Sequence, residues 1–188
     1  PSRAALLTGV YPHQAGMGHM TRDRGIPSYS GTILPNVPTL AERLRKGGYR
    51  TMMAGKWHLG TEPHQSPIAR GFDRFYGTRN FIDSYFTVLR NCQVYLDDKE
   101  VLPATENPVN HLYPEQEWYT TDVFTDYALH FMEESLEKHQ TVNAKLKEVV
   151  DVLKEKLDEV NLTNAKLLYT NRILRKSSLN ERQKNKIV

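Results

Sequence analysis

Residues 39–60 read TLAERLRKGGYRTMMAGKWHLG, and this stretch decides the fold class. Thr39 is a candidate N-cap, the seven residues after it are expected to form a helix, and the glycine pair at 47–48 is its stop. The apolar run over 49–54 predicts a short buried strand that ends at Gly55. A helix, a glycine turn and an apolar strand make half of a β-α-β unit, so the sequence predicts an α/β fold.

The surrounding sequence predicts two more helices and a long loop. Pro1 at the first helical position, followed by the alanines and leucines of 4–7, predicts a two-turn helix that stops at Gly9. Apolar residues repeat at three and four over 118–134 and predict another helix there. Residues 10–38 carry scattered glycine and proline without a sustained period, which predicts a loop.

Composition divides the chain after Leu136. All 11 glycines and all 10 prolines lie in residues 1–136, and none lies in 137–188. The front segment has a net charge of −2, whereas the back segment has a net charge of +5. We therefore predict two domains of different nature, 1–136 and 137–188.

Several classes of protein are excluded by composition. A single cysteine excludes a disulfide framework and a cysteine-based zinc site. There is no run of 18 apolar residues, so no membrane-spanning helix is expected. No basic-then-apolar leader opens the chain, and it begins with Pro1 instead of Met, so we expect the start of the gene product to be missing. The compartment is therefore left open.

Three basic side chains are candidates for an anion-ester site. Lys56 and His58 follow the predicted strand, where α/β folds place their chemistry. Arg3 lies in the first turn of a predicted helix, where the helix dipole favours an anion. Arginine offers a planar fork, lysine a point charge and histidine a movable proton. On spacing alone, a surface arginine, a solvated lysine and a structural histidine remain the alternative.

Four stretches resemble the sulfatase family. Residues 1–9, PSRAALLTG, resemble its first signature, which reads Cys or Ser, any residue, Pro-Ser-Arg and then Leu-Leu-Thr-Gly. Residues 48–60, GYRTMMAGKWHLG, are similar to the second signature. The stretches 70–77 and 119–128 resemble the parts that follow in arylsulfatases. Residues 1–136 therefore resemble an N-terminal fragment of the sulfatase (arylsulfatase) catalytic domain.

The resemblance implies an alkaline-phosphatase-like α/β fold and hydrolysis of a sulfate ester. The family's nucleophile is a formylglycine made from the motif's Cys or Ser, and a Ca²⁺ ion assists it. By motif position, Arg3 would steady the formylglycine hydrate, Lys56 would bridge it and the sulfate, and His58 would hydrogen-bond the hydrate. Lys56 and His58 would thus also bind substrate. Cations placed in advance stabilise the charge that grows on sulfuryl oxygens.

The chain also departs from the family pattern. The modifiable residue would lie two places before Pro1, and Cys92 lacks the Pro-Ser-Arg context. The Asp and Asn ligands of Ca²⁺ are expected outside this chain. The acidic pair Asp97-Asp98 predicts a turn between strands in preference to a metal site. We therefore expect this chain to be inactive on its own.

Two other groups of residues have simpler explanations. His13, His19 and His64 lie in loops without metal-ligand spacing, which favours a surface position. Trp57 has two open interpretations, because it could line a substrate pocket or pack in the core.

The back segment carries a heptad pattern, which we name the heptad seam. Its a and d positions run in alternating steps of three and four from Asn143 to Leu174. Asparagine occupies the a positions 143, 164 and 171, which favours two strands. The sequence thus predicts a coiled-coil-like helix that self-associates through 143–174. Packing on its own front domain, or a lone helix, is the alternative.

The tail has further features of its own. Its lysines alternate with acids and no aromatic platform is present, so neither nucleic acid nor a membrane is expected as a partner. Ser178 is expected to cap a last short helix, with Glu181 completing a capping box. Residues 162–169 and 178–188 faintly resemble tailed-phage prohead scaffold proteins. The alternative function is therefore an assembly protein that acts through its helical tail.

Overall fold

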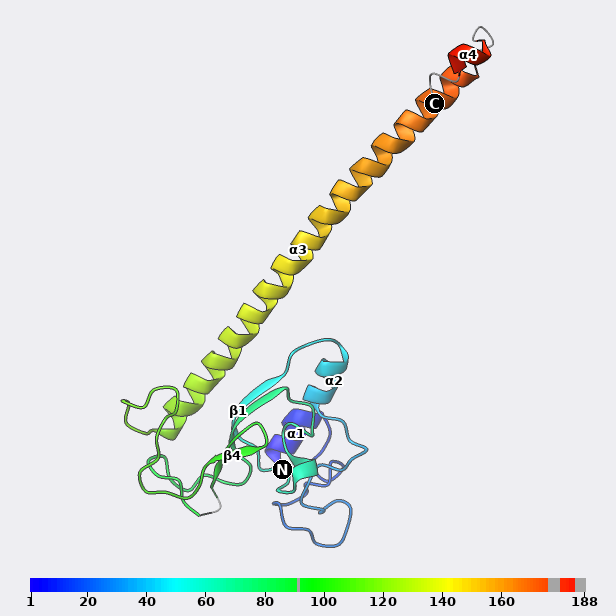
Figure 1. Cartoon of the computed structure of the whole chain (residues 1–188). Helices are drawn as coiled ribbons and strands as arrows, with labels where there is room; N and C mark the ends of the chain where they lie inside the picture. Colours follow the sequence, from blue (N-terminus) through cyan, green and yellow to red (C-terminus); the bar gives the residue numbers. More distant parts are fainter. Residues whose placement is uncertain (91, 176–179, 185–188) are drawn as a thin grey trace. The chain divides into compact units, whose positions relative to one another are not determined.

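The computed structural model describes residues 1–90, 92–175 and 180–184 (Figure 1). The chain divides into two compact units, Pro1–Ser135 and Leu136–Val188. The described elements are, in chain order, α1 (Ser2–Thr8), α2 (Leu40–Lys46), β1 (Met52–Lys56), the 3-10 turn η1 (Pro63–Gln65), β2 (Arg74–Thr78), β3 (Val94–Leu96), β4 (Lys99–Leu102), α3 (Thr120–Leu174) and α4 (Glu181–Lys184).

The first unit is built around a four-stranded mixed sheet in the order β1-β2-β3-β4. β1 and β2 are parallel, in register from Met52 opposite Arg74 to Lys56 opposite Thr78. The two remaining pairs are antiparallel. Helices and a sheet with a parallel pair confirm the predicted α/β class, although the sheet is mixed.

The predicted bounds of the first strand were wrong, because it covers Met52–Lys56 instead of 49–54 and so begins three residues later and ends two residues later. Thr51 precedes the strand, and its hydroxyl donates to the Gly71 carbonyl at 2.6 Å. Gly55 does not end the strand, because it pairs with Gly77 of β2. A Cβ on Gly77 would overlap the Gly55 carbonyl oxygen, so glycine is needed at position 77, where these strands approach closely; Gly55 has a positive φ of 125°.

The two short helices form largely as predicted. Thr39 caps α2, accepting a hydrogen bond from the Glu42 N–H at 3.0 Å while the Glu42 carboxylate accepts from the Thr39 N–H at 2.8 Å. α1 begins at Ser2 with Pro1 as its N-cap, one residue later than predicted. Gly9 ends it in the left-handed conformation, with φ of 72°. The predicted loop over 10–38 is confirmed, and a single bridge joins Met17 to Tyr29.

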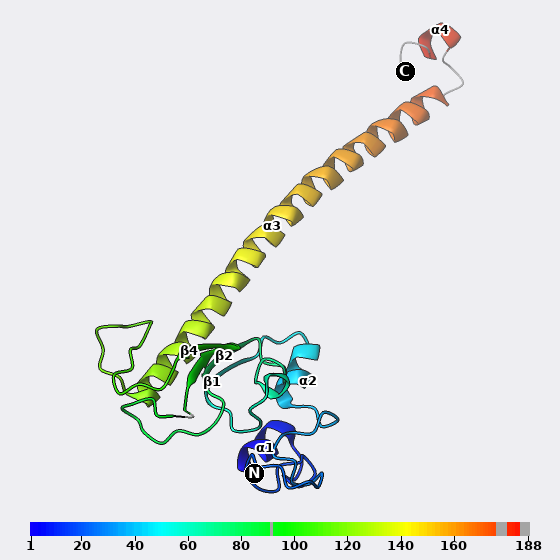
Figure 2. The ribbon, with the colours of Figure 1, turned by 60° about the horizontal axis from the view of Figure 1, so that its bottom comes forward.

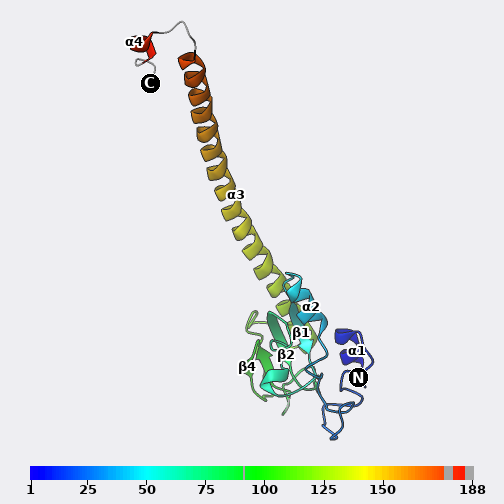
Figure 3. The same cartoon turned by 90° about the vertical axis from the view of Figure 1, so that its right-hand side faces the viewer.

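Successive residues of β2 point to opposite faces of the sheet and bury two separate cores. Phe75 packs in one core with Ala4 of α1 and Ala41 of α2. Tyr76 packs in the other, stacked on Tyr127 of α3 with ring centroids 3.4 Å apart. Accordingly, α1 and α2 lie together on one side of the strands (Figure 2; Figure 3). The sheet is therefore covered by helices on both faces.

The helix predicted over 118–134 does not end there, because α3 continues as one helix from Thr120 to Leu174. Residues 137–188 contain no glycine or proline, so nothing in the sequence stops it. Its first part, within the first unit, buries Val123, Tyr127 and Phe131. All side chains over 136–169 are exposed. The helical tail is thus confirmed, while coiled-coil pairing stays a prediction.

The structure also bears on the expected absence of a membrane-spanning helix and on the last short helix. Among the described residues, no helix is long and apolar enough to cross a membrane. The short helix α4 covers Glu181–Lys184, and its predicted cap, Ser178, lies outside the described residues.

Candidate active site

The candidate site lies at the carboxyl end of β1. Parallel pairing with β2 continues beyond the strand, because the Trp57 N–H donates to the Thr78 carbonyl at 2.8 Å and the His58 N–H to the Arg79 carbonyl at 3.1 Å. His58 adopts a left-handed conformation with φ of 56°, which non-glycine residues seldom adopt. These bonds fix the main chain of both Lys56 and His58 at one edge of the sheet.

The structure brings Arg3 to the same edge. Its side chain extends from the first turn of α1, and Nη1 donates to the Lys56 carbonyl at 2.6 Å, across 53 residues of sequence. A guanidinium offers five N–H groups, so this one bond leaves donors for a ligand. The geometry therefore favours a cluster of three basic residues over three unrelated surface side chains.

Burial and mutual repulsion act on the charges of this cluster. Burial lowers the pKa of Lys56, and the Arg3 charge lowers it further, while Asp83 opposes the shift. Burial also lowers the pKa of His58, assisted by the charges of Lys56 and Arg3. Both shifts disfavour further positive charge on the cluster. An anion placed there would relieve the repulsion, so the cluster is suited to bind one.

Two residues near Lys56 escaped prediction from sequence. Asp83 and Cys92 both act on the pKa of the Lys56 ammonium group. Cys92 is a buried free cysteine, and burial raises the pKa of its thiol, which keeps the thiol protonated. Had Arg74–Thr78 been identified as a strand, the rule that sites follow strand ends would have pointed to Asp83.

Trp57 packs in the core instead of lining a pocket. It is fully buried, and its Nε1 donates to the Gln65 carbonyl at 2.9 Å. Its ring meets the Phe72 ring edge-on, with centroids 6.2 Å apart. Of its two interpretations, the structure supports the structural one.

The acidic pair forms a hairpin turn, as predicted. Asp97 and Asp98 lie between β3 and β4, and Asp97 has φ of 56°. The Asp97 carboxylate accepts from the Phe75 N–H at 3.0 Å, and Asp98 pairs with Arg79 at 2.6 Å. Both carboxylates are therefore engaged by the protein.

The described residues do not provide a site for the Ca²⁺ that the family implies. Nowhere over 1–90, 92–175 and 180–184 do three or more His, Cys, Asp or Glu side chains gather so that they could hold a metal ion. His13, His19 and His64 are exposed, as predicted, although His64 lies in the 3-10 helix η1 and not in a loop; the Nε2 of His13 lies 3.2 Å from the Tyr29 hydroxyl. The described residues therefore do not fit the ion.

Curated proteins similar to this chain are sulfatases. The arylsulfatase of Klebsiella aerogenes is 42% identical over 92 residues, which cover 45% of this chain and 20% of that protein. The N-acetylgalactosamine-6-sulfatase of Mus musculus is 35% identical over 141 residues, covering 71% of this chain and 26% of that protein. The chain thus spans about a quarter or less of the length of these curated relatives.

Solved structures similar to this chain include a sulfatase. Ps i-CgsB has a TM-score of 0.57 and 28% identity, covering 73% of this chain and 31% of that one. The PsFucS1 sulfatase from Pseudoalteromonas sp. has a TM-score of 0.51 and 22% identity over 73% of this chain and 31% of that one, which supports the fold alone. These neighbours are consistent with the expected alkaline-phosphatase-like fold.

The family profile described as Sulfatase matches residues 1–142, well over half of the chain. This match includes Arg3, Lys56 and His58 and ends within α3. The relatives give no support to the resemblance between the tail and prohead scaffold proteins. From the profile match and the relatives together, the chain belongs to the sulfatase family.

Proposed function

We propose that Arg3, Lys56 and His58 form the sulfuryl-binding part of a sulfatase active site, and that the whole protein is a sulfuric ester hydrolase. The observation that supports this most directly is the hydrogen bond from Arg3 to the Lys56 carbonyl, which joins the two signature stretches in space. Family membership supports the reaction class. The names of the relatives include arylsulfatase, steryl-sulfatase and N-acetylgalactosamine-6-sulfatase, so a sulfate ester is the proposed substrate.

In this proposal each residue has a distinct role. The free N–H groups of Arg3 and the Lys56 ammonium group bind sulfuryl oxygens, where negative charge grows during ester cleavage. Because its pKa is lowered, His58 is mainly neutral at pH 7, and its ring donates or accepts one hydrogen bond near the nucleophile. Main-chain bonds hold the backbone around Lys56 and His58, and the side-chain bond to the Lys56 carbonyl holds Arg3, so little reorganisation is needed when the substrate arrives.

A binding experiment tests the anion site without requiring turnover. Titration of the 188-residue chain with sodium sulfate, followed by amide NMR shifts at constant ionic strength, should give saturable changes near residues 3 and 56–58. Lys56→Ala should abolish saturation, whereas the matched control Lys46→Ala, which removes a lysine from the end of α2, should leave it unchanged. Equal sulfate affinity in both variants would contradict the proposal.

The nucleophile belongs to the proposal as well. Family resemblance implies a formylglycine two positions before Pro1, and that position is not among these 188 residues. We therefore expect the chain by itself to show no turnover of a chromogenic aryl sulfate, even with Ca²⁺ and a formylglycine-generating enzyme present. Turnover above that of Lys56→Ala would show that the chain is active without it.

We propose a separate role for the tail, which is pairing with a second copy of this chain through the heptad seam over 143–174. Its apolar members over 146–167, which include Leu146, Leu153 and Leu157, are exposed. An apolar stripe at this spacing is stable when a second helix covers it, and asparagine at a positions favours two strands.

Two matched leucine variants test the pairing. Leu157 lies in the heptad seam and is 59% exposed, whereas Leu162 lies off it and is 57% exposed. In sedimentation equilibrium of the full chain, the wild type and Leu162→Asp should form dimers, and Leu157→Asp should remain a monomer. A wild-type monomer at the highest attainable concentration, or equal loss of dimer in both variants, would refute self-association.

A further inference from the structure

A pocket lies beside the candidate active site, past the ends of β1 and β2. Its volume is about 130 Å³, and its lining residues are Thr61, Thr78, Arg79, Asn80, Gln93 and Tyr95. The main-chain bonds that hold Trp57 and His58 run to Thr78 and Arg79, so the candidate site and the pocket share one wall. A molecule bound at Arg3, Lys56 and His58 could therefore extend into this pocket.

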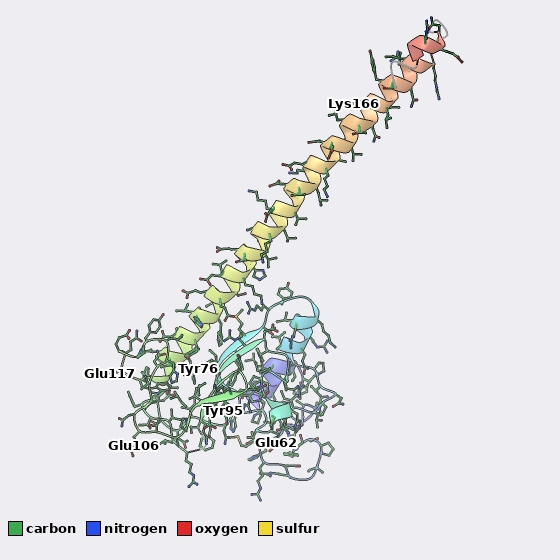
Figure 4. The ribbon with its side chains drawn as sticks, in the orientation of Figure 1. Glu62, Tyr76, Tyr95, Glu106, Glu117 and Lys166 are labelled. Carbon is green, nitrogen blue, oxygen red and sulfur yellow. The ribbon has the colours of Figure 1, made fainter. Side chains whose placement is uncertain are left out.

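Arg79 is the fixed element of this pocket. It is 9% exposed, and its Nη2 donates to the Asp98 carboxylate at 2.6 Å. Its guanidinium lies over the Tyr95 ring, 4.3 Å from the ring centroid. Tyr95 belongs to β3, the strand next to the β2 strand that carries Tyr76 (Figure 4). Its Nε is buried without a hydrogen-bond partner within the described parts of the chain. The Asp98 carboxylate compensates the charge of Arg79, so the pocket carries little net charge.

The remaining lining groups are uncharged and polar. Asn80 and Gln93 each offer an amide that both donates and accepts, and the two threonines offer hydroxyls. A ligand rich in neutral hydroxyl groups matches such a set. A second sulfate does not, because Asp98 already takes the arginine charge. A flat apolar group does not match either, since Arg79 covers one face of the single aromatic ring.

The volume of the pocket limits the size of the group that it can hold. Pockets that enclose a whole drug-sized ligand measure about 300 to 1,000 Å³, well above this one. The pocket therefore takes one part of a substrate, the rest of which lies elsewhere.

We propose that this pocket is a sugar subsite, which binds an uncharged sugar unit next to the sulfated unit held by Lys56 and His58. The substrate class is then a sulfated oligosaccharide, and Asn80 and Gln93 are specificity-determining residues. This inference rests on the proposed function, because it needs the sulfated unit to occupy the site of Arg3, Lys56 and His58.

Three probes separate the subsite from the sulfate site. They are a disaccharide with one O-sulfate, the corresponding sulfated monosaccharide and the unsulfated disaccharide, each titrated by NMR into the 188-residue chain. The test variant is the double change Asn80→Ala and Gln93→Ala, with Gln93→Ala alone as a milder version. The matched control removes two amides outside the pocket, by Asn107→Ala and Gln116→Ala. Amide spectra verify that each variant is folded.

The sugar subsite predicts that the wild type binds the sulfated disaccharide about tenfold more tightly than the monosaccharide, a difference of about 1.4 kcal/mol. The double variant should lose this advantage and bind the monosaccharide as before, and the control should keep it. If wild type binds both sulfated probes equally, or the double variant keeps the advantage, the subsite is refuted while the proposed function stands. If neither sulfated probe binds, or Lys56→Ala binds both normally, the proposed function fails and the subsite with it.

Discussion

The first unit and the tail differ in what their side chains contact. In Pro1–Ser135, residues such as Phe75, Tyr76 and Phe131 are fully buried between sheet and helices. Over residues 136–169 every side chain is exposed, although one helix, α3, runs through both units. The same secondary structure is therefore stabilised in two ways, by tertiary packing in the first unit and by local helix propensity in the tail.

This difference has a consequence for stability. Burial of apolar area is the main favourable contribution to folding, so the first unit should unfold cooperatively. A single helix without a covered face unfolds gradually from its ends. Three predictions test the contrast, in order of decreasing effect.

The largest effect is expected from truncating a core side chain. Phe75→Ala should lower the free energy of unfolding of the first unit by about 3 to 5 kcal/mol, since it removes a fully buried ring from the core that includes Ala4 and Ala41. Leu153→Ala in the tail should change it by less than about 0.5 kcal/mol in the monomer. Urea denaturation at low protein concentration measures both, and a comparable loss in Leu153→Ala would mean that the tail is packed in the monomer.

A smaller effect is expected from two matched threonine changes. The buried Thr39 hydroxyl caps α2 and donates to the Arg70 carbonyl at 2.7 Å, so Thr39→Ala should cost about 1 to 2 kcal/mol of unfolding free energy. Thr163 lies in the exposed tail and donates to the Glu159 carbonyl at 2.9 Å. Thr163→Ala should instead raise helicity slightly, because alanine has the better helix propensity, by up to about 0.7 kcal/mol. Circular dichroism in urea distinguishes the two, and equal losses would contradict the contrast.

The smallest effect concerns pH and is confined to the first unit. Since the pKa of His58 in the folded state is lower than its ordinary 6.5, the unfolded state binds more protons between the two values. The stability that His58 contributes is therefore complete above pH 6.5 and is lost as the pH falls through the folded pKa.

Sulfate should reverse this shift, because an anion favours the protonated ring and its binding is linked to the proton. NMR titration of the His58 imidazole should give a pKa below 6.5 without sulfate and a higher one with saturating sulfate. An unchanged pKa in saturating sulfate would place the anion away from His58.

Local sequence signals predicted α2 and the hairpin turn correctly, whereas α1 begins one residue later than expected and the helix predicted over 118–134 continues to Leu174. The cap and stop residues around α2, Thr39 and Gly47, act over one helical turn, so the sequence contains all that determines them. Asp97 takes a positive φ in the predicted turn, which aspartate tolerates better than most residues. The mixed sheet was not predicted, because pairing of β2 with β3 joins residues about 20 apart in sequence.

Only the part of the candidate site that lies in recognisable motifs could be predicted from the sequence. Residue types and family resemblance predict Arg3, Lys56 and His58, and the structure brings Arg3 to the Lys56 carbonyl. The roles assigned to these residues stay predictions. The pocket around Arg79 was not foreseen, because its lining comes from β2, β3 and the segments next to the strands, and the order of the strands in the sheet is set by tertiary packing.

The glycine pair at 55 and 77 affects how mutational scans of this protein should be interpreted. Any side chain at position 77 would push apart the two parallel strands that end at Lys56 and Thr78. Variants at Gly77 would then lose activity by displacing reactive groups that they never touch. A saturation screen would score this glycine as highly as a catalytic residue, although its contribution is purely the absence of atoms.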